Sequence, residues 1–376
     1  MSRPDISTTP VWILRSYRAG ENGQLLGLAE RLGLPYRSIE VRYRAGAGPL
    51  GLFGAVSCAG ITPESRVQFA PPWPRLLLTA GLRNEPLARW VQRASGGATR
   101  LVFVGRTWCS LQALDLLVTT PQYRIADGPR VQRNRLTQHR ITPERLADQG
   151  ETAHPLLAGL SGPVIGVLVG GSSGPYVLGA RSALRLADTL RALQRRSGGA
   201  LAVTTSARTS AEFVTALAEA LPADARLYRW RPNDPDNPYF AMLSAADALV
   251  VTGDSVAMLS EAAATGRPVL IWDVPVDAAG DHSVAARAYR FMMRCLPDRL
   301  TRDVGIVHRE LVSTGMATML RANGEADGAF DGPPRATGPE QTTVTGEAIG
   351  WETRARNQAS VQAEIDVTLR RLRALL

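Results

Sequence analysis

Residues 251–262, Val-Thr-Gly-Asp-Ser-Val-Ala-Met-Leu-Ser-Glu-Ala, form the strongest candidate for chemistry in this chain. Asp254 and Ser255 follow a β-rich apolar run and precede a helical pattern, so either side chain can cap the helix. Glu261 lies among small and apolar residues, where a carboxylate needs partners because burying it unpaired is costly. A ribose diol would supply two hydroxyl donors to it. A salt bridge to a nearby arginine is the alternative.

A glycine-serine turn is the second candidate. Gly170-Gly171-Ser172-Ser173-Gly174 follows the predicted strand Val164–Val169 and precedes the predicted helix Ser182–Leu193. Glycines let the backbone approach a phosphate, and the N–H groups with the helix dipole favour the anion. The spacing is neither GxGxxG nor GxxxxGK[ST], so a plain tight turn explains the segment equally well.

Three further residues are candidates for catalysis or anion binding. Arg208 follows a predicted strand and could pair with a phosphate through two hydrogen bonds, or form a surface salt bridge. Glu21 lies in the first turn between a strand and a helix, where it is a candidate general base toward an acceptor hydroxyl or a helix cap. We assign Asn22, its neighbour, to the same catalytic turn. We expect neither a metal nor any other cofactor, with the nucleotide sugar as a substrate.

The basic residues are all arginines, 43 in number, because the sequence contains no lysine. Mechanisms that need a lysine amine are therefore excluded. Residues 1–155 hold 20 arginines and 11 acidic residues, whereas residues 156–376 hold 23 of each. A basic half attracts anions, namely nucleic acid, phosphorylated substrates or an anionic bilayer.

The segment Ala45–Pro63 is uncharged and closely follows Arg37, Arg42 and Arg44. It is a surface loop or a membrane-dipping segment, and we assign the three arginines to contact with an acceptor or membrane.

The N-terminus lacks the apolar run of a signal peptide, and no stretch is typical of a spanning helix. Three widely spaced cysteines favour a reducing compartment over a disulfide framework or zinc site. We therefore expect a cytoplasmic protein, with possible peripheral contact at the inner face of the membrane.

The elements that must position these residues are alternating short strands and helices, which predict parallel βα units. The pattern begins at Val11–Leu14 and restarts at Val164–Val169. It predicts an α/β protein with two doubly wound Rossmann-type domains facing a central cleft. We expect the N-terminal domain over residues 1–157, the C-terminal domain over 158–322, a flexible linker or loop over 323–350 and a terminal helix over 351–376.

The glycine-serine turn and the Asp254–Glu261 segment together resemble the sugar-nucleotide half of GT-B glycosyltransferases, above all those that add N-acetylglucosamine to lipid-linked peptidoglycan precursors. The resemblance implies that Gly171, Ser172 and Ser173 face the diphosphate and that Glu261 faces the ribose. The full set assigned to the donor is Gly170, Gly171, Ser172, Ser173, Arg208, Asp254, Ser255, Ser260 and Glu261.

A broader resemblance, over about residues 10–320, is to the plant elongated-mitochondria (mitochondrial fission) family and its bacterial relatives, which are described as glycosyltransferases of GT-B type. The matching segments are Gly20–Gln24, Gly27–Glu30, Thr119–Arg124, Leu168–Ser172, Thr204–Thr209, Asn237–Tyr239 and Asp254–Glu261. The chain departs from the family pattern at Gly23, Leu82 and Ala207.

The resemblance implies an enzyme that moves a sugar from a nucleoside-diphosphate sugar to an anionic or lipid-linked glycan acceptor in envelope polysaccharide synthesis. The basic N-terminal domain would bind the acceptor and the neutral C-terminal domain the donor. A nucleoside-diphosphate-sugar 2-epimerase is one alternative, and a non-catalytic membrane-associated protein is another. No recognition motif supports nucleic acid as a partner.

Overall fold

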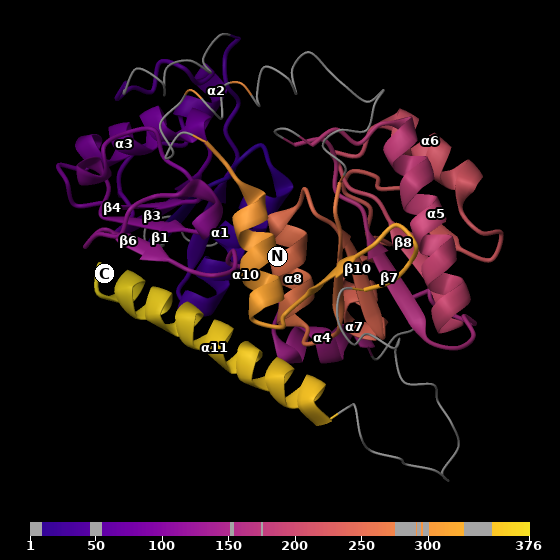
Figure 1. Cartoon of the computed structure of the whole chain (residues 1–376). Coiled ribbons are helices and arrows are strands. Elements are labelled where there is room, and N and C mark those ends of the chain that lie inside the picture. The colour runs from indigo at the N-terminus through magenta and orange to yellow at the C-terminus, as the bar shows by residue number, and fades with distance from the viewer. Residues whose placement is uncertain are drawn as a thin grey trace. The chain divides into compact units, whose positions relative to one another are not determined.

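The computed structural model describes residues 10–45, 55–150, 154–173, 176–274, 301–326 and 348–376, together with Phe291 and Cys295. The chain divides into two compact units, which Figure 1 shows as α/β arrangements. The first unit runs to Arg140 and includes the short segment ending at Asp303 and the C-terminal segment Gln362–Leu376. The second unit contains the rest. Each unit holds a parallel six-stranded sheet, as the strand–helix alternation predicts.

The sheet of the first unit has the strand order β2-β1-β3-β4-β5-β6. Its strands are β1 (Val11–Leu14), β2 (Tyr36–Ile39), β3 (Leu76–Ala80), β4 (Arg100–Val104), β5 (Leu116–Thr119) and β6 (Val131–Arg133). Val11 of β1 is in register with Tyr36 of β2 on one side and with Leu76 of β3 on the other. The chain therefore reverses its direction of travel through the sheet between β1 and β3. Such a switch point is where open α/β sheets bind ligands, at the carboxyl ends of the strands.

Helices α1 (Ala19–Leu32), α2 (Pro63–Arg66) and α3 (Glu85–Ala94) accompany this sheet. The core includes the buried side chains of Trp12, Leu77 and Phe103 on the strands and Val91 on α3. Short 3₁₀ turns follow β3, β4 and β5 at Leu82–Asn84, Leu111–Ala113 and Pro121–Tyr123. The turns after β3 and β5 bring polar groups such as Asn84 and Gln122 to the carboxyl edge of the sheet.

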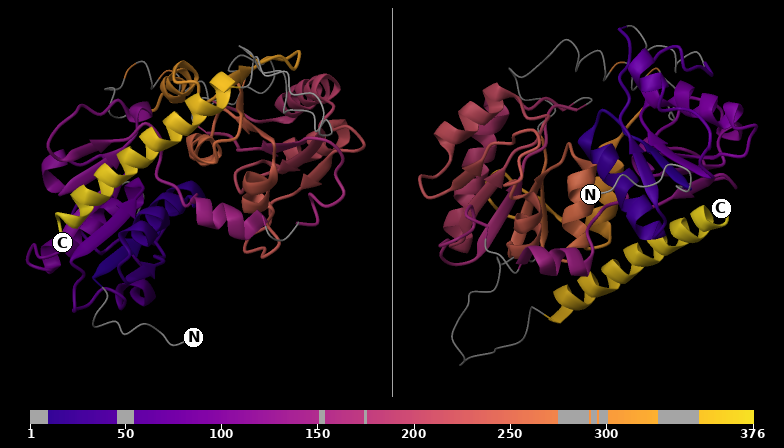
Figure 2. Two further views of the ribbon diagram at one scale, coloured as in Figure 1. Left: turned by 90° about the horizontal axis from the view of Figure 1, so that it is seen from below. Right: turned by 180° about the vertical axis from the view of Figure 1, so that it is seen from behind.

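The C-terminal segment forms the long helix α11 (Ala348–Arg373), where the sequence predicts a helix over 351–376 (Figure 2). Its last turns dock onto the first unit, where the amide of Asn134 donates to Thr368 at 2.9 Å. Arg371 donates to the carbonyl of Val131 at 2.6 Å, and Glu364 accepts the backbone N–H of Arg135 at 2.7 Å. The end of α11 thus completes the unit beside β6.

The sheet of the second unit has the order β12-β11-β10-β7-β8-β9. Its strands are β7 (Val164–Leu168), β8 (Ala200–Thr204), β9 (Arg226–Tyr228), β10 (Ala248–Thr252), β11 (Val269–Trp272) and β12 (Thr318–Leu320). From β7 the chain moves to β8 and β9 on one side and then to β10, β11 and β12 on the other. The switch point of this sheet therefore lies between β7 and β10.

The described helices of the second unit are α4 (Pro143–Gly150), α5 (Ala180–Ser197), α6 (Ala211–Ala220), α7 (Tyr239–Ala245), α8 (Val256–Ala264) and α10 (Val304–Ser313). Helix α4 packs on α7, where Ser244 donates to the carbonyl of Leu146 at 2.6 Å and Arg145 lies over the ring of Phe240. Because of this packing, the division between the units follows Arg140, ahead of the boundary at 157/158 that the sequence suggests.

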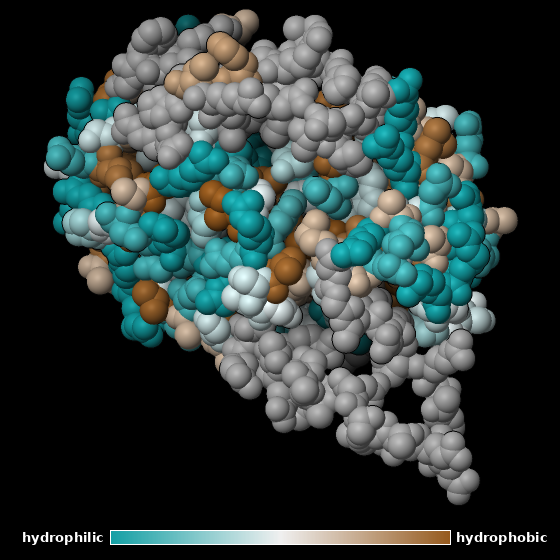
Figure 3. All heavy atoms as spheres, in the orientation of Figure 1, coloured by the Kyte–Doolittle hydropathy of each residue, from teal (hydrophilic) through white to brown (hydrophobic). Residues whose placement is uncertain are grey.

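Two segments singled out by the sequence lie largely outside the described residues. Of Ala45–Pro63, residues 46–54 are not described, but an antiparallel bridge between Tyr43 and Ile61 joins the flanking parts. Of the predicted linker, residues 327–347 are not described. No helix of the described residues is long and apolar enough to cross a membrane. On the face drawn in Figure 3, hydrophobic residues are scattered among hydrophilic ones.

Candidate functional site

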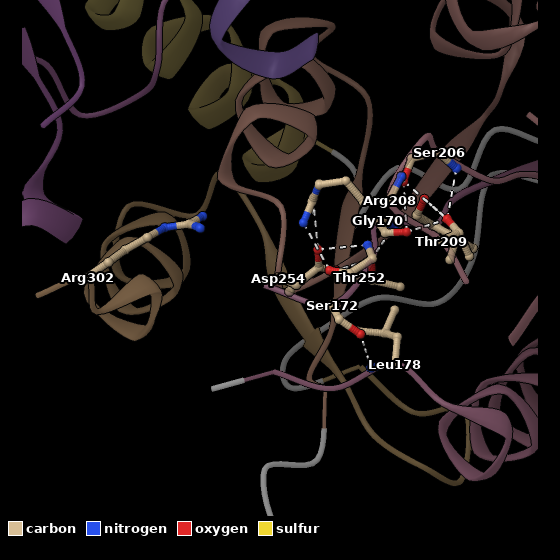
Figure 4. A network of polar contacts seen from close by, with 12 residues as sticks. Gly170, Ser172, Leu178, Ser206, Arg208, Thr209, Thr252, Asp254 and Arg302 are labelled. Carbon is tan, nitrogen blue, oxygen red and sulfur yellow. Dashed lines mark hydrogen bonds and ion pairs between the residues drawn. The ribbon is translucent and has the colours of Figure 1, made fainter. Parts of the chain in front are cut away.

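Three turns meet around Asp254 at the carboxyl ends of β7, β8 and β10 (Figure 4). The carboxylate of Asp254 is fully buried. Its Oδ2 accepts the N–H of Gly171 at 3.0 Å and Nη2 of Arg208 at 3.0 Å, while Oδ1 accepts the hydroxyl of Thr252 at 2.7 Å. The three turns are thus tied together at the switch point of the sheet.

Close packing explains why the first turn contains glycine. A Cβ on Gly170 would lie 2.4 Å from Oδ2 of Asp254, and one on Gly171 would lie 2.1 Å from the carbonyl oxygen of Arg208. Gly253, in the turn after β10, is similar, because a Cβ there would lie 2.7 Å from Cε1 of His308. The glycines therefore serve the approach of the chain's own groups. A need to approach phosphate is not required to explain them.

Three of the backbone N–H groups of this turn make hydrogen bonds within the chain. The N–H of Gly170 donates to Thr252 at 2.8 Å, that of Gly171 to Asp254, and that of Ser173 to the carbonyl of Tyr176 at 3.0 Å. The predicted backbone cradle for a diphosphate is therefore not supported at these three positions. Ser172 differs, because its hydroxyl oxygen accepts the N–H of Leu178 at 3.0 Å and its proton remains for another acceptor.

The turn after β8 clamps the turn after β7. The hydroxyls of Ser206 and Thr209 both donate to the carbonyl of Gly170, at 2.9 and 2.5 Å. Arg208 donates from Nη1 to the carbonyl of Gly171 at 3.0 Å, and its side chain is 38% exposed. The guanidinium is thus anchored on one side and open to solvent on the other. The sequence identified Arg208 but not the anchoring roles of Ser206 and Thr209, whose only signal was the Thr204–Thr209 motif.

The turn after β10 leads into α8. Ser255 is the N-terminal flanking residue of α8, and neither it nor Asp254 caps the helix as the sequence suggested: Ser255 makes no side-chain cap bond, and Asp254 binds Thr252, Gly171 and Arg208. Ser260 is fully buried, and its hydroxyl donates to the carbonyl of Val256 at 2.8 Å within the same helix. The contact with a donor predicted for Ser260 therefore has no support in the structure.

Glu261 projects from α8 to Tyr239, at the start of α7. The phenol of Tyr239 donates to Oε2 of Glu261. The backbone N–H of Tyr239 donates to Oδ1 of Asn237 at 3.0 Å, which fixes the start of α7. Burial, with the nearby charge of Glu261, raises the pKa of Tyr239 well above its usual value, so the phenol stays protonated as a donor. The sequence missed this partner, whose signal was the Asn237–Tyr239 motif.

Glu21 and Asn22 lie in the first turn of helix α1, near the switch point of the first unit, and not in a turn between strand and helix as the sequence suggested. Asn22 accepts the N–H of Ser16 at 2.7 Å and donates to its carbonyl at 2.8 Å. The hydroxyl of Ser16 donates to Oε2 of Glu21, and Arg18 lies 3.4 Å from the other carboxylate oxygen. Asn22 thus holds the turn, whereas Glu21 presents a carboxylate that is 18% exposed.

The three arginines assigned to an acceptor or membrane differ in their surroundings. Arg37, on β2, donates to the carbonyl of Gln68 at 3.1 Å and lies over the ring of Trp12. Arg42 and Arg44 are exposed and flank Tyr43. Of the three arginines, only Arg42 and Arg44 are exposed enough to contact an acceptor or a membrane surface. Among the described residues, no group of three or more His, Cys, Asp or Glu side chains could hold a metal ion.

Two Rossmann-type sheets, each with polar turns at its switch point, define the fold of GT-B proteins. The chain belongs to the mitochondrial fission ELM1 family, whose model matches residues 19–293. It is 32% identical to the mitochondrial fission protein ELM1 of Arabidopsis thaliana over 133 residues, which are 35% of this chain. The match spans 31% of that relative's length.

Solved structures resemble this chain at low identity. The rice protein Os79, in complex with U2F and trichothecene, is 11% identical with a TM-score of 0.53, covering 97% of this chain and 99% of that chain. The glycosyltransferase SnogD of Streptomyces nogalater is 16% identical with a TM-score of 0.48 at the same coverage. The UDP-GlcNAc 2-epimerase of Neisseria meningitidis, bound to UDP-GlcNAc, is 12% identical with a TM-score of 0.42, covering 81% and 98%.

Proposed function

We propose that this protein is a glycosyltransferase that uses a nucleoside-diphosphate sugar as donor. The observation that carries the proposal is Arg208, held by the buried Asp254 at the switch point between β7 and β10. An anchored, half-exposed guanidinium at the carboxyl edge of a doubly wound sheet suits a diphosphate, because arginine pairs with phosphate oxygens through two parallel hydrogen bonds.

The donor would bind to the second unit. Arg208, the hydroxyl of Ser172 and the N-terminus of α8 would stabilise the diphosphate as its negative charge develops during departure. Glu261, oriented by Tyr239, would accept hydrogen bonds from the ribose hydroxyls. The proposal assigns no step to a metal, so activity is expected to survive a chelator such as EDTA.

The acceptor would bind to the basic first unit. An acceptor hydroxyl oxygen attacks the anomeric carbon of the sugar, and the bond from that carbon to the diphosphate oxygen breaks. The bonding electrons leave with the nucleoside diphosphate, and the hydroxyl proton passes to the carboxylate of Glu21. A positively charged acceptor unit favours an anionic or lipid-linked glycan, such as those of envelope polysaccharide synthesis, and a peripheral position on an anionic membrane.

Product analysis tests the proposal. The full chain is incubated with a panel of nucleotide sugars, alone and with phosphorylated or lipid-linked glycan acceptors, and the products are separated by mass and by sugar identity. A transferase releases nucleoside diphosphate only when an acceptor is present. Conversion of the nucleotide sugar to its 2-epimer without acceptor would instead establish an epimerase. Binding to anionic vesicles with indifference to every nucleotide sugar would establish a non-catalytic membrane protein.

A further inference from the structure

A cavity of about 230 Å³ opens at the switch point of the first unit, between the ends of β1 and β3. Its lining includes Arg15, Ser16, Tyr43, Gly81, Arg83 and Asn84. We infer that this cavity binds a phosphate group carried by the glycosyl acceptor, with Arg83 as the principal anion-binding residue. That the ligand is a glycosyl acceptor rests on the proposed function, whereas the binding of phosphate at this site is tested separately.

The charges around the cavity leave an excess of one arginine. Arg15 is paired with Glu40 at 3.7 Å, and both side chains are exposed. Arg18 is paired with Glu21. Arg83 is exposed, and within the described part of the chain it contacts no carboxylate, only the ring of Tyr17, 5.5 Å from its guanidinium carbon.

Arg15, in the neighbouring ion pair with Glu40, is a second cation that can bind a phosphate. Exposed pairs such as Arg15–Glu40 contribute little to stability, so a phosphate can displace Glu40 at little cost. The ring of Tyr17 is 64% exposed and also lies beside Arg18, 5.2 Å from its guanidinium carbon. A doubly charged phosphate, which several guanidiniums can share, therefore fits this surface better than a neutral sugar does.

A rigid polar floor supports these cations. The buried amide of Asn84 donates to the carbonyls of Leu14, Arg15 and Ala80 at 3.2, 3.0 and 3.0 Å, which ties β1 to β3. Its oxygen accepts the phenol of Tyr43 at 2.5 Å. Burial raises the pKa of this phenol, although the charge of Arg83 acts in the opposite direction. The hydrogen bonds of Asn84 thus fix the wall of the cavity before a ligand binds. The charge of Arg83 acts on the phenol of Tyr43 in that wall.

The candidate base borders the same cavity. Gly81 has a φ of +84°, and a Cβ there would lie 3.1 Å from Oε2 of Glu21 and 3.1 Å from the hydroxyl of Ser16. Glu21 therefore lies against two residues of the lining. A phosphate held at Arg83 would place the attached sugar of the acceptor near this carboxylate, which is the arrangement that proton removal from its hydroxyl needs.

Calorimetric titration of the full chain tests the inference with four probes, namely inorganic phosphate, a hexose phosphate, glucuronate and phosphatidylglycerol vesicles. The variant is Arg83→Gln, and the control is Arg93→Gln, which removes an exposed arginine from the last turn of α3. We expect the hexose phosphate to bind the parent and the control alike, and Arg83→Gln to weaken it at least tenfold. Glucuronate should bind less tightly than the hexose phosphate.

The four probes distinguish a sugar phosphate from a lipid headgroup as the ligand. A further titration distinguishes failure of this inference from failure of the proposed function. Binding of vesicles but not of the hexose phosphate, lost in Arg83→Gln, would identify a lipid headgroup as the source and keep the site. Equal losses in both variants, or no binding of any phosphate probe, would overturn the inference. Nucleoside diphosphate is titrated in parallel and should bind Arg83→Gln as it binds the parent. Its failure to bind the parent would count against the proposed function alone.

Discussion

Nη2 of Arg208 lies 3.0 Å from Oδ2 of Asp254, and the carboxylate is fully buried while the guanidinium is 38% exposed. The pair joins the turn after β8 to the turn after β10. A buried carboxylate without partners is costly, and the partners of Asp254 include Arg208, the N–H of Gly171 and the hydroxyl of Thr252. Its ion pair in turn holds Arg208 in place. A cation is thereby fixed at the switch point before any ligand arrives.

Replacing Asp254 by Asn should destabilise the protein. The substitution keeps the shape but removes the charge that binds Arg208, and a hydrogen bond to a charged group contributes about 1.5–3 kcal/mol. The free energy of unfolding, measured with urea, should fall by that amount. Asp188→Asn is the control, because Asp188 pairs with Arg191 on the surface and its loss should cost less than about 1 kcal/mol. Equal effects of the two substitutions would refute the anchoring role.

Adding a methyl group at Gly170 or Gly171 should disrupt the turn after β7. The new Cβ would overlap Asp254 or the backbone of Arg208, and overpacking typically costs about 1–3 kcal/mol. Gly128→Ala is the control, since no atom lies within 4 Å of a Cβ there. Thermal unfolding should show a lower midpoint for the first two variants only. Unchanged midpoints would mean that the turn is not packed as described.

Tyrosine ionisation should report the Tyr239–Glu261 contact. The phenol of Tyr239 has a pKa above that of the unfolded chain, so the unfolded state loses its proton first as the pH rises. The contribution of this phenol to the free energy of unfolding should therefore be constant below about pH 9 and fall as the pH rises above about 10. Tyr239→Phe should flatten that decline and remove one late-titrating tyrosine from the absorbance at 295 nm. The remaining tyrosines of the eight and the three cysteines also titrate in the alkaline range, so the difference between Tyr239→Phe and the parent is what reports Tyr239. An unchanged alkaline slope in Tyr239→Phe would contradict the buried contact.

The thiols should differ in reactivity. Cys58 and Cys109 are buried, and burial, with the charge of Glu85, raises the pKa of Cys109 to about 11. Cys295 is exposed. Because the thiolate is the reactive form, a disulfide reagent such as DTNB should modify one thiol in the native protein and three after unfolding. Rapid reaction in a Cys295→Ser variant would show that a second thiol is accessible.

The alternation of strands and helices could be predicted from the sequence because buried parallel strands are continuous apolar runs. Strand β1 has the bounds that the sequence predicted, and β7 begins at the predicted Val164 but ends one residue earlier, at Leu168. Short edge strands such as β6 and β12 carry too few apolar residues to stand out. The packing of α4 on α7 also left no local signal, because it depends on residues about a hundred positions apart.

The candidate site was predicted in part. Position along the chain indicated that Gly170, Arg208 and Asp254 follow strand ends, and parallel topology brings such residues to one edge. The partners were not predictable, because a hydrogen bond from Tyr239 to Glu261 or from Asn84 to three carbonyls depends on tertiary geometry. Asn22 shows the same limit, since its side chain is engaged by the backbone of Ser16.

Calorimetric titration of the parent and of Glu261→Gln with a panel of nucleoside diphosphates tests the central claim most directly. One charge-assisted hydrogen bond to the ribose contributes about 1.5–3 kcal/mol, which corresponds to an affinity change of roughly 10- to 100-fold. We predict that the parent binds at least one nucleoside diphosphate and that Glu261→Gln weakens it by that factor without unfolding. A parent that binds none of them, or a variant that binds with unchanged affinity, would contradict the account.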